Sequence, residues 1–265
     1  MHSDIRFALY AIKKNIQSSA ELRSSFWLNI VGMAINNCSF VIIWSFFTKS
    51  VGAINGWSVA DIIGLNGFIA LTFGIIFSVG AGIRSLPEYV AGGTFDRFML
   101  SPKNLLVRIA TANFGTAAIG DIIFGLICLI FFGILINATM LQIALIFALA
   151  IIATIAFLAA TIVIFSSSFL FTDATSATPS IFDLYITPSM FHGGAFQGVL
   201  RFFYTFIIPS LVIGTLPVEA VRDLDWTKMA LIVITTLIWF WLSLRIFKRA
   251  VRKYESANFV NFNSN

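Results

Sequence analysis

Long apolar stretches separated by short polar segments dominate the sequence. Five of them contain about 20 or more residues, which is the length that a helix needs to cross a hydrocarbon core about 30 Å thick. We therefore expect five membrane-spanning helices. They lie at about residues 26–47, 59–82, 109–135, 141–168 and 229–247.

The segment between the fourth and fifth of these stretches has a mixed character. Residues 173–196 contain two prolines together with Asp183 and His192, whereas residues 202–216 are apolar and contain one proline. Two interpretations fit. Either the first part is a polar span followed by an apolar hairpin that does not cross, or the first part is cytoplasmic and a span lies near residues 202–221. Each interpretation gives an all-α membrane protein with six transmembrane helices.

Composition supports a membrane protein and excludes several other classes. Hydrophobic residues make up 58% of the 265 residues and charged residues 11%, whereas a soluble domain usually has about 25% charged residues. The two cysteines, Cys38 and Cys128, both lie in apolar stretches, which excludes a scaffold held by disulfides. We expect one transmembrane domain over residues 1–265.

The net charge of +5 reflects where lysine and arginine lie around the expected spans. In the six-span arrangement thirteen of the 17 basic residues lie on one side: four before the first span, four in the loop after the second, and five in the basic tail 245–265. Cytoplasmic segments carry such an excess, so both termini are expected in the cytoplasm. The surplus needs no nucleic-acid partner, and the lipid bilayer is the partner that it predicts.

The segment before the first span, residues 1–25, has a helical apolar stripe. Basic residues lie off this stripe, as in helices that lie flat at a membrane surface. We expect an amphipathic interface helix on the cytoplasmic side, which either only anchors the chain or also contacts a cytoplasmic partner. The stripe consists of Ile5, Leu9, Ile12, Ile16 and Ala20.

The loop 83–108 between the second and third spans is longer than a simple turn. Gly92 and Gly93 break the chain, Thr94 is a possible N-cap for a short helix over 95–100, and Pro102 ends it. Such a helix would present the aromatic rings at 95 and 98 on one side. It could dock another protein or pack beneath the bundle.

At this loop the chain resembles a known family, the membrane subunits of type 2 ABC exporters. That family has a short coupling helix with the pattern Gly, acidic, Leu, Pro, and here Gly93, Asp96, Leu100 and Pro102 follow in that order. The apolar segment 196–217, with prolines at 209 and 217, is similar to the family's segment before the last span. The tail, Lys-Arg-Ala-Val-Arg-Lys-Tyr-Glu-Ser-Ala over 248–257, is similar to the ending of one branch.

The resemblance implies a permease subunit of a bacterial ABC exporter in the inner (plasma) membrane. A second permease chain, identical or paralogous, would complete the pathway, and separate ATPase subunits would bind ATP and Mg²⁺, with no cofactor in this chain. It also favours the first interpretation above, with residues 194–222 forming a half-inserted hairpin on the outer side. The residues it assigns to ATPase coupling are Glu88, Gly93, Asp96, Arg97, Leu100 and Pro102.

Polar residues within the expected spans are the candidates for a translocation pathway. Asp121 lies about ten residues into the third stretch, which places it near the midplane if the helix begins at 109. A carboxylate at that depth costs at least about 2.5 kcal/mol, so it should face the bundle and either serve the pathway, bind a proton, or accept a hydrogen bond from an Asn or Thr. Asn29 and Asn36 share a polar face of the first span, which could serve the pathway or helix packing.

Small residues at every fourth position indicate close helix packing in two other spans. They are Asn66, Ala70, Gly74, Ser78 and Gly82 in the second span and Ala153, Ala156 and Ala160 in the fourth. Such seams allow helix backbones to approach closely, so we expect a compact bundle without a permanent pore.

Catalytic motifs and metal-ligand spacings are not found in the sequence. No lysine follows a glycine, which excludes the phosphate-binding Gly-x-x-x-x-Gly-Lys-Ser/Thr loop. His192 has no second His or Cys at ligand spacing, so no metal site is predicted. Two alternatives to the exporter remain: a proton-coupled secondary transporter using Asp121, and an intramembrane enzyme acting on lipids through Asp121, Asp183 and His192.

Overall fold

The computed structural model describes residues 2–21, 23–51 and 56–254, and in these ranges the chain is helical and contains no strand. Six helices in these ranges are long. They are α1 (His2–Glu21), α2 (Arg23–Val51), α3 (Val59–Val79), α7 (Ala117–Leu135), α8 (Met140–Ser166) and α12 (Trp226–Val251). The shorter α-helices are α4 (Leu86–Ala91), α5 (Asp96–Met99), α6 (Leu105–Ala110), α9 (Ala174–Ile186), α10 (Gly198–Phe202) and α11 (Thr215–Arg222). The end of the tail motif, Ser256 and Ala257, lies outside the described residues.

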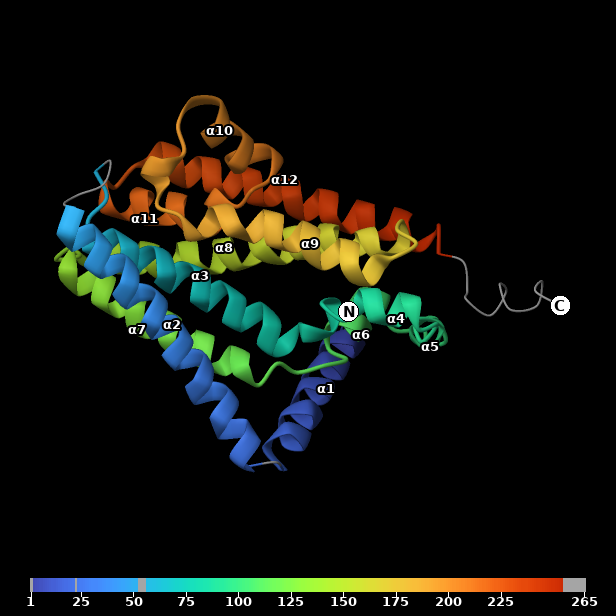
Figure 1. Ribbon diagram of the computed structural model, residues 1–265. Helices are drawn as coiled ribbons and strands as arrows, with labels where there is room; N and C mark the ends of the chain where they lie inside the picture. Colours follow the sequence, from blue (N-terminus) through green and yellow to red (C-terminus); the bar gives the residue numbers. More distant parts are fainter. Residues whose placement is uncertain (1, 22, 52–55, 255–265) are drawn as a thin grey trace.

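Five helices in the described residues are long and apolar enough to cross a membrane, which confirms the five predicted spans. They are Arg23–Phe46, Val59–Val79, Ala117–Leu135, Met140–Phe169 and Trp226–Val251. These helices run along one common direction in Figure 1, with α3 lying between α7 and α8.

The third span begins later than predicted, because α7 starts at Ala117 and not near 109. Residues before it form α6, which ends at Ala110, and a non-helical link in which the N–H of Gly115 donates to the carbonyl of Ser78 at 3.4 Å. A Cβ at position 115 would lie 2.3 Å from the carbonyl oxygen of Phe77, so only glycine allows this approach. As a consequence Asp121 lies about 6 Å along α7 from its start, and its depth in a membrane stays a prediction.

Close backbone contacts hold α3 against α7. A Cβ at Gly74 would lie 2.6 Å from the backbone nitrogen of Ile122, and one at Gly125 would lie 2.4 Å from the backbone nitrogen of Leu71. The three alanines of the seam predicted in the fourth span, Ala153, Ala156 and Ala160, are fully buried. The small-residue seams predicted in the second and fourth spans are thus the sites of tight packing.

One end of the bundle gathers elements that lie far apart in the sequence. The start of α1, the short helices α4 to α6 and the end of α12 all lie there (Figure 1). Asn15 of α1 donates from Nδ2 to the carbonyl of Thr111 at 2.9 Å, and the N–H of Asn104 donates to Oδ1 of Asp4 at 3.2 Å. This last hydrogen bond lowers the pKa of the Asp4 carboxyl.

The segment after α8 is divided into short pieces. Pro179 lies inside α9, and Pro188 lies in the 3₁₀ turn Thr187–Met190 that follows it. α9 has 13 residues, too few to cross a hydrocarbon core alone, so the sixth predicted span is not confirmed as a single long helix. The chain nevertheless runs along the bundle from the end with α4 to the end with α11 (Figure 1).

Beyond α9 the chain forms a hairpin whose first arm, around α10, is largely exposed, whereas residues 209–221 are buried in the bundle. α10 continues into a π-helical turn, Phe203–Ile207, and α11 follows after Pro209. The indole N–H of Trp239 donates to the carbonyl of Phe206 at 3.0 Å. Since Trp239 lies about 20 Å along α12 from Trp226, the hairpin reaches roughly half the length of that helix.

Candidate coupling surface and translocation groove

The predicted coupling loop folds into three short helices rather than one. α5 is a single turn, Asp96–Met99, and its N-cap position is Phe95 with helical backbone angles. Thr94 does not cap it, since its hydroxyl instead donates to the carbonyl of Tyr89 at 3.4 Å. Gly93 has a φ of 65°, a conformation that glycine adopts without steric cost and that turns the chain between α4 and α5.

Phe95 is buried, which agrees with the alternative that the aromatic side of this segment packs beneath the bundle. Its side chain has no exposed area, and its ring lies 4.9 Å from the ring of Phe169 and 4.7 Å from that of Tyr254, measured between centroids. Phe169 directly follows α8, and Tyr254 directly follows α12. The loop is therefore attached to the ends of two spans through one side chain.

The residues of α5 and its C-terminal end that follow Phe95 are mostly exposed to solvent. Leu100 is 86% exposed and Met99 is 52% exposed, while Asp96 is half-buried in the first turn of α5. Arg108 of α6 holds the turn in place, because its guanidinium donates to the carbonyls of Phe98 and Arg97. Of the other predicted coupling residues, Glu88, Arg97 and Pro102 are exposed and Gly93 is half-buried.

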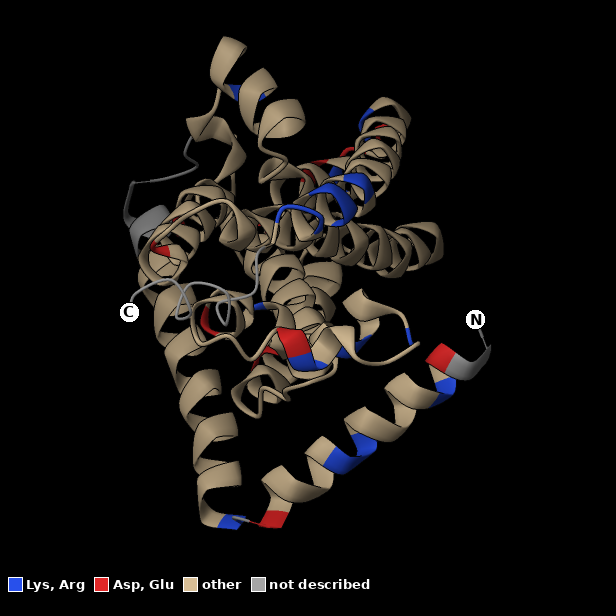
Figure 2. Cartoon of the chain, turned by 90° about the vertical axis from the view of Figure 1, so that its right-hand side faces the viewer, with Lys and Arg blue, Asp and Glu red and all other residues tan. Residues whose placement is uncertain are grey.

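Charged side chains mark this end of the molecule. Figure 2 looks onto it, with α1 crossing below and the basic end of α12 above it. From Arg245 to Tyr254 the chain has five lysines and arginines and no acidic residue. The four acidic residues Asp61, Glu219, Asp223 and Asp225 instead take part in ion pairs at the opposite end of the bundle.

A polar groove of about 400 Å³ lies between α2, α3 and α7. Asp121 lies in it and is only 8% exposed, and Nδ2 of Asn37 donates to its Oδ1 at 2.6 Å. Among the predicted roles of Asp121, which were to serve the pathway, to bind a proton or to accept a hydrogen bond from an Asn or Thr, the structure shows the hydrogen bond. The other two roles stay predictions. The other polar residues that line the groove are Asn36, Ser39 and Asn66.

The structure does not bring Asn29 to this groove. Its Nδ2 donates to the carbonyl of Ser25 at 2.8 Å, one turn earlier on α2. The groove instead receives Asn37 and Asn66, which the sequence reasoning did not assign to the pathway. The face of α2 that lines the groove runs through Met33, Asn36, Asn37 and Phe40. It shares Asn36 with the predicted polar face but does not include Asn29.

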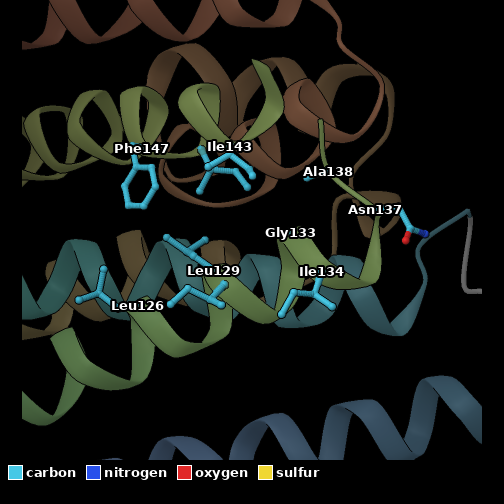
Figure 3. Close-up of a pocket in the computed structure, with 10 residues that line it drawn as sticks. Leu126, Leu129, Gly133, Ile134, Asn137, Ala138, Ile143 and Phe147 are labelled. Atoms are coloured by element: carbon cyan, nitrogen blue, oxygen red, sulfur yellow. The ribbon is translucent and has the colours of Figure 1, made fainter. Parts of the chain in front are cut away.

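A larger groove, of about 520 Å³, lies between the ends of α7 and α8. Figure 3 shows Leu126, Leu129 and Ile134 of α7 facing Ile143 and Phe147 of α8 across it. Asn137 is the one polar residue in its lining. Because it lacks groups that could recognise a polar cargo, we assign it to contact with the apolar part of the bilayer.

Ion pairs tie the hairpin to the end of the bundle opposite α5. Glu219 of α11 pairs with Arg201 of α10 and with Lys228 of α12, the latter at 3.2 Å. Arg222 pairs with Asp61 at 3.2 Å and with Asp223 at 2.8 Å. The Arg222 guanidinium holds the pKa of Asp223 below its usual value. These contacts fix α10 and α11 relative to the starts of α3 and α12.

The three residues considered for an enzyme acting on lipids, Asp121, Asp183 and His192, lie in different parts of the structure. Asp121 is hydrogen-bonded in the groove of α2, and Asp183 is exposed on α9. The ring of His192 lies 6.3 Å from the ring of Trp57, and burial lowers its pKa. Within the described residues no group of three or more His, Cys, Asp and Glu is placed to hold a metal ion.

The arrangement of long apolar helices defines an integral membrane protein, and comparison with known proteins identifies its family. Over residues 34–258 the chain matches ABC-2 family transporter proteins, and it belongs to that family. The chain is thus the membrane component of a transport system, as the sequence motifs indicated. Neither the curated proteins nor the solved structures that were compared gave a match.

Proposed function

We propose that the chain is the permease subunit of a bacterial ABC exporter and is driven by separate ATPase subunits. The observation that carries this proposal is the segment 83–108, which exposes Leu100 and Met99 at the end of the bundle while Phe95 is buried within it. An exposed apolar turn bordered by Asp96 and Arg97 suits a protein partner, whereas a buried aromatic ring suits transmission of a movement into the bundle.

The proposed topology has six crossings. Because α1 begins and α12 ends at the same end of the bundle, the number of crossings between them must be even. The sixth crossing is α9 with its following 3₁₀ turn, and the hairpin 194–222 is half-inserted from the outer side. The hydrogen bond from Trp239 to Phe206 supports this depth, since irregular backbone inside a membrane needs such partners.

Orientation follows from charge. The end with α1, α5 and the basic end of α12 would face the cytoplasm by the positive-inside rule. There α1 would lie at the interface, since its apolar residues Ile5 and Leu9 are 53% and 64% exposed and would contact lipid.

A second permease chain, identical or paralogous, would cover α2 and close the groove. Only 6% of the most apolar part of α2 is buried, so this helix is available to another chain. In that arrangement Asn36 and Asp121 would face the pathway between the two permeases. ATP and Mg²⁺ would be bound by the ATPase, and its closure would press on α5 and shift α8 and α12 through Phe95.

Copurification tests the docking part of the proposal. We expect tagged protein, purified from its native membrane, to retain an ATPase subunit, and Asp96→Arg to lower that retention about tenfold, the effect of losing a contact worth about 1.4 kcal/mol. Leu100→Asp should act similarly, because this side chain is exposed and its replacement leaves packing intact. Glu21→Arg, an exposed charge reversal on α1, is the control and should change nothing. Full retention in both docking variants would exclude this surface.

The proton-coupled transporter is the second candidate, because Asp121 is a buried carboxylate in a polar groove. Asp121→Asn removes the titrating group and retains an acceptor oxygen for Asn37. For an ATP-driven exporter we expect transport within about twofold of the wild type, the range of a substitution that keeps the hydrogen bond. Abolished transport in Asp121→Asn, together with transport driven by a pH gradient in vesicles without ATP, would instead establish the proton-coupled mechanism.

A further inference from the structure

The cytoplasmic end of α12 forms one side of a groove whose other side is α6. The groove has a volume of about 270 Å³, and apolar side chains from both helices line it, among them Leu105, Leu106 and Phe247. Its rim carries Asn104, Lys248 and Arg252. The two helices are thus separated here by a space that side chains of the described residues do not fill.

The two cations at the rim share one face of α12. Lys248 and Arg252 are four residues apart, so they lie one above the other on the helix surface. Both side chains are exposed, and neither forms an ion pair within the part of the chain that the structure describes. A pair of free cations over an apolar groove attracts a ligand with a negative group and a hydrocarbon part.

The direction of the groove matches the direction of a membrane lipid. Lys248 lies 22 residues after Trp226, or about 33 Å along the helix, which is the thickness of the hydrocarbon core. Its charge is therefore expected at the headgroup level. Leu244, which also lines the groove, lies one turn deeper, at the level of the acyl chains.

We infer that this groove binds one anionic glycerophospholipid of the cytoplasmic leaflet, such as phosphatidylglycerol. The phosphodiester would be bound by Lys248 and by the planar guanidinium of Arg252, which matches the geometry of phosphate oxygens. One acyl chain would lie against Leu105 and Phe247 between α6 and α12. Basic pockets between transmembrane helices bind anionic headgroups in this way.

Such a lipid would link two parts of the proposed coupling end. α6 carries Arg108, which holds α5 through the carbonyls of Phe98 and Arg97, and α12 precedes Tyr254, which contacts Phe95. A lipid between α6 and α12 would therefore stabilise the position of α5. This inference rests on the proposed membrane orientation but not on the identity of the motor or the cargo.

Lipid retention measured by native mass spectrometry tests the inference. The intact protein is taken from nanodiscs that contain equal amounts of phosphatidylglycerol and phosphatidylcholine. We expect the wild type to retain phosphatidylglycerol selectively. Each cation near the membrane surface contributes about fivefold, so the double variant K248Q/R252Q should retain about 25-fold less of this lipid. Addition of millimolar inorganic phosphate should not displace the lipid, since phosphate lacks the acyl chain.

The adjacent cations provide a matched control. R249Q/K253Q removes the same charge from the same turn, but these residues do not line the groove, so retention should stay at the wild-type level. Leu106→Trp fills the groove without a change of charge and should also lower retention, while the thermal unfolding midpoint shows whether each variant is folded. Equal loss in the two charge-neutralised pairs, or equal retention of phosphatidylcholine, would overturn the inference. The inference would also be overturned if K248Q/R252Q lost ATPase copurification while lipid retention stayed unchanged, because the groove would then be a contact site for a protein.

Discussion

Gly125→Ala should destabilise the protein by about 2–3 kcal/mol, because the added methyl group has no space. A Cβ at this position would lie 2.4 Å from the backbone nitrogen of Leu71 and 2.8 Å from its Cα. Backbone atoms cannot rotate away as the end of a side chain can, so α3 and α7 must separate along their main contact. Thermal unfolding of the purified protein in detergent should show a lower midpoint, and less folded protein should accumulate in the membrane.

Gly133 offers a control within the same helix. A Cβ at Gly133 would have its nearest neighbours at 3.8 Å, which is ordinary van der Waals contact. Gly133→Ala should leave the unfolding midpoint unchanged or raise it, since alanine favours helix by up to about 1 kcal/mol over glycine. If the two alanine variants had equal midpoints, the close contact between α3 and α7 would not determine stability.

Phe95→Ala should have the largest effect of any substitution in the coupling segment. The ring is fully buried between Phe169 and Tyr254, and truncation of a buried phenylalanine costs about 3–5 kcal/mol. In addition to lower stability, we expect transport to fall at least tenfold while the exposed residues of α5 still bind the ATPase. The measurement is ATPase copurification together with transport and ATP hydrolysis in proteoliposomes.

Two further variants separate coupling from folding. Phe95→Leu keeps most of the buried volume and should fold, yet it loses the aromatic contacts and should still lower transport per ATP hydrolysed. Leu100→Ala changes an exposed side chain, so stability should change by less than about 0.5 kcal/mol while ATPase binding weakens. Normal transport per ATP in Phe95→Leu would show that movement does not pass through this ring.

The long spans could be predicted from the sequence because a membrane-crossing helix needs a continuous apolar run, and the five runs are unmistakable. The predicted start of the third span is wrong, because the prediction counts Asn113, Gly115 and Thr116 as part of the span. The break there depends on the contact of Gly115 with the backbone at Phe77 and Ser78, a tertiary feature that has no local signal.

Some features of the candidate site could be predicted from the sequence and others could not. The assignment of the segment 83–108 to coupling stays a prediction from the motif. The burial of Phe95 could not be predicted, because Phe169 and Tyr254 are remote in sequence. An asparagine partner for Asp121 was among the expectations. The identity of that partner, Asn37, depends on the rotation of α2 about its axis, which the sequence does not reveal because asparagines lie on more than one face of this helix.

The contacts of Phe95 also bear on biogenesis. Phe95 leaves the ribosome well before Phe169 and long before Tyr254, the last described residue of the chain. The loop can therefore reach its final conformation only after translation of the closing helix is complete. A partly synthesised or truncated subunit would lack the finished docking face, so motor recruitment would await a fully assembled permease.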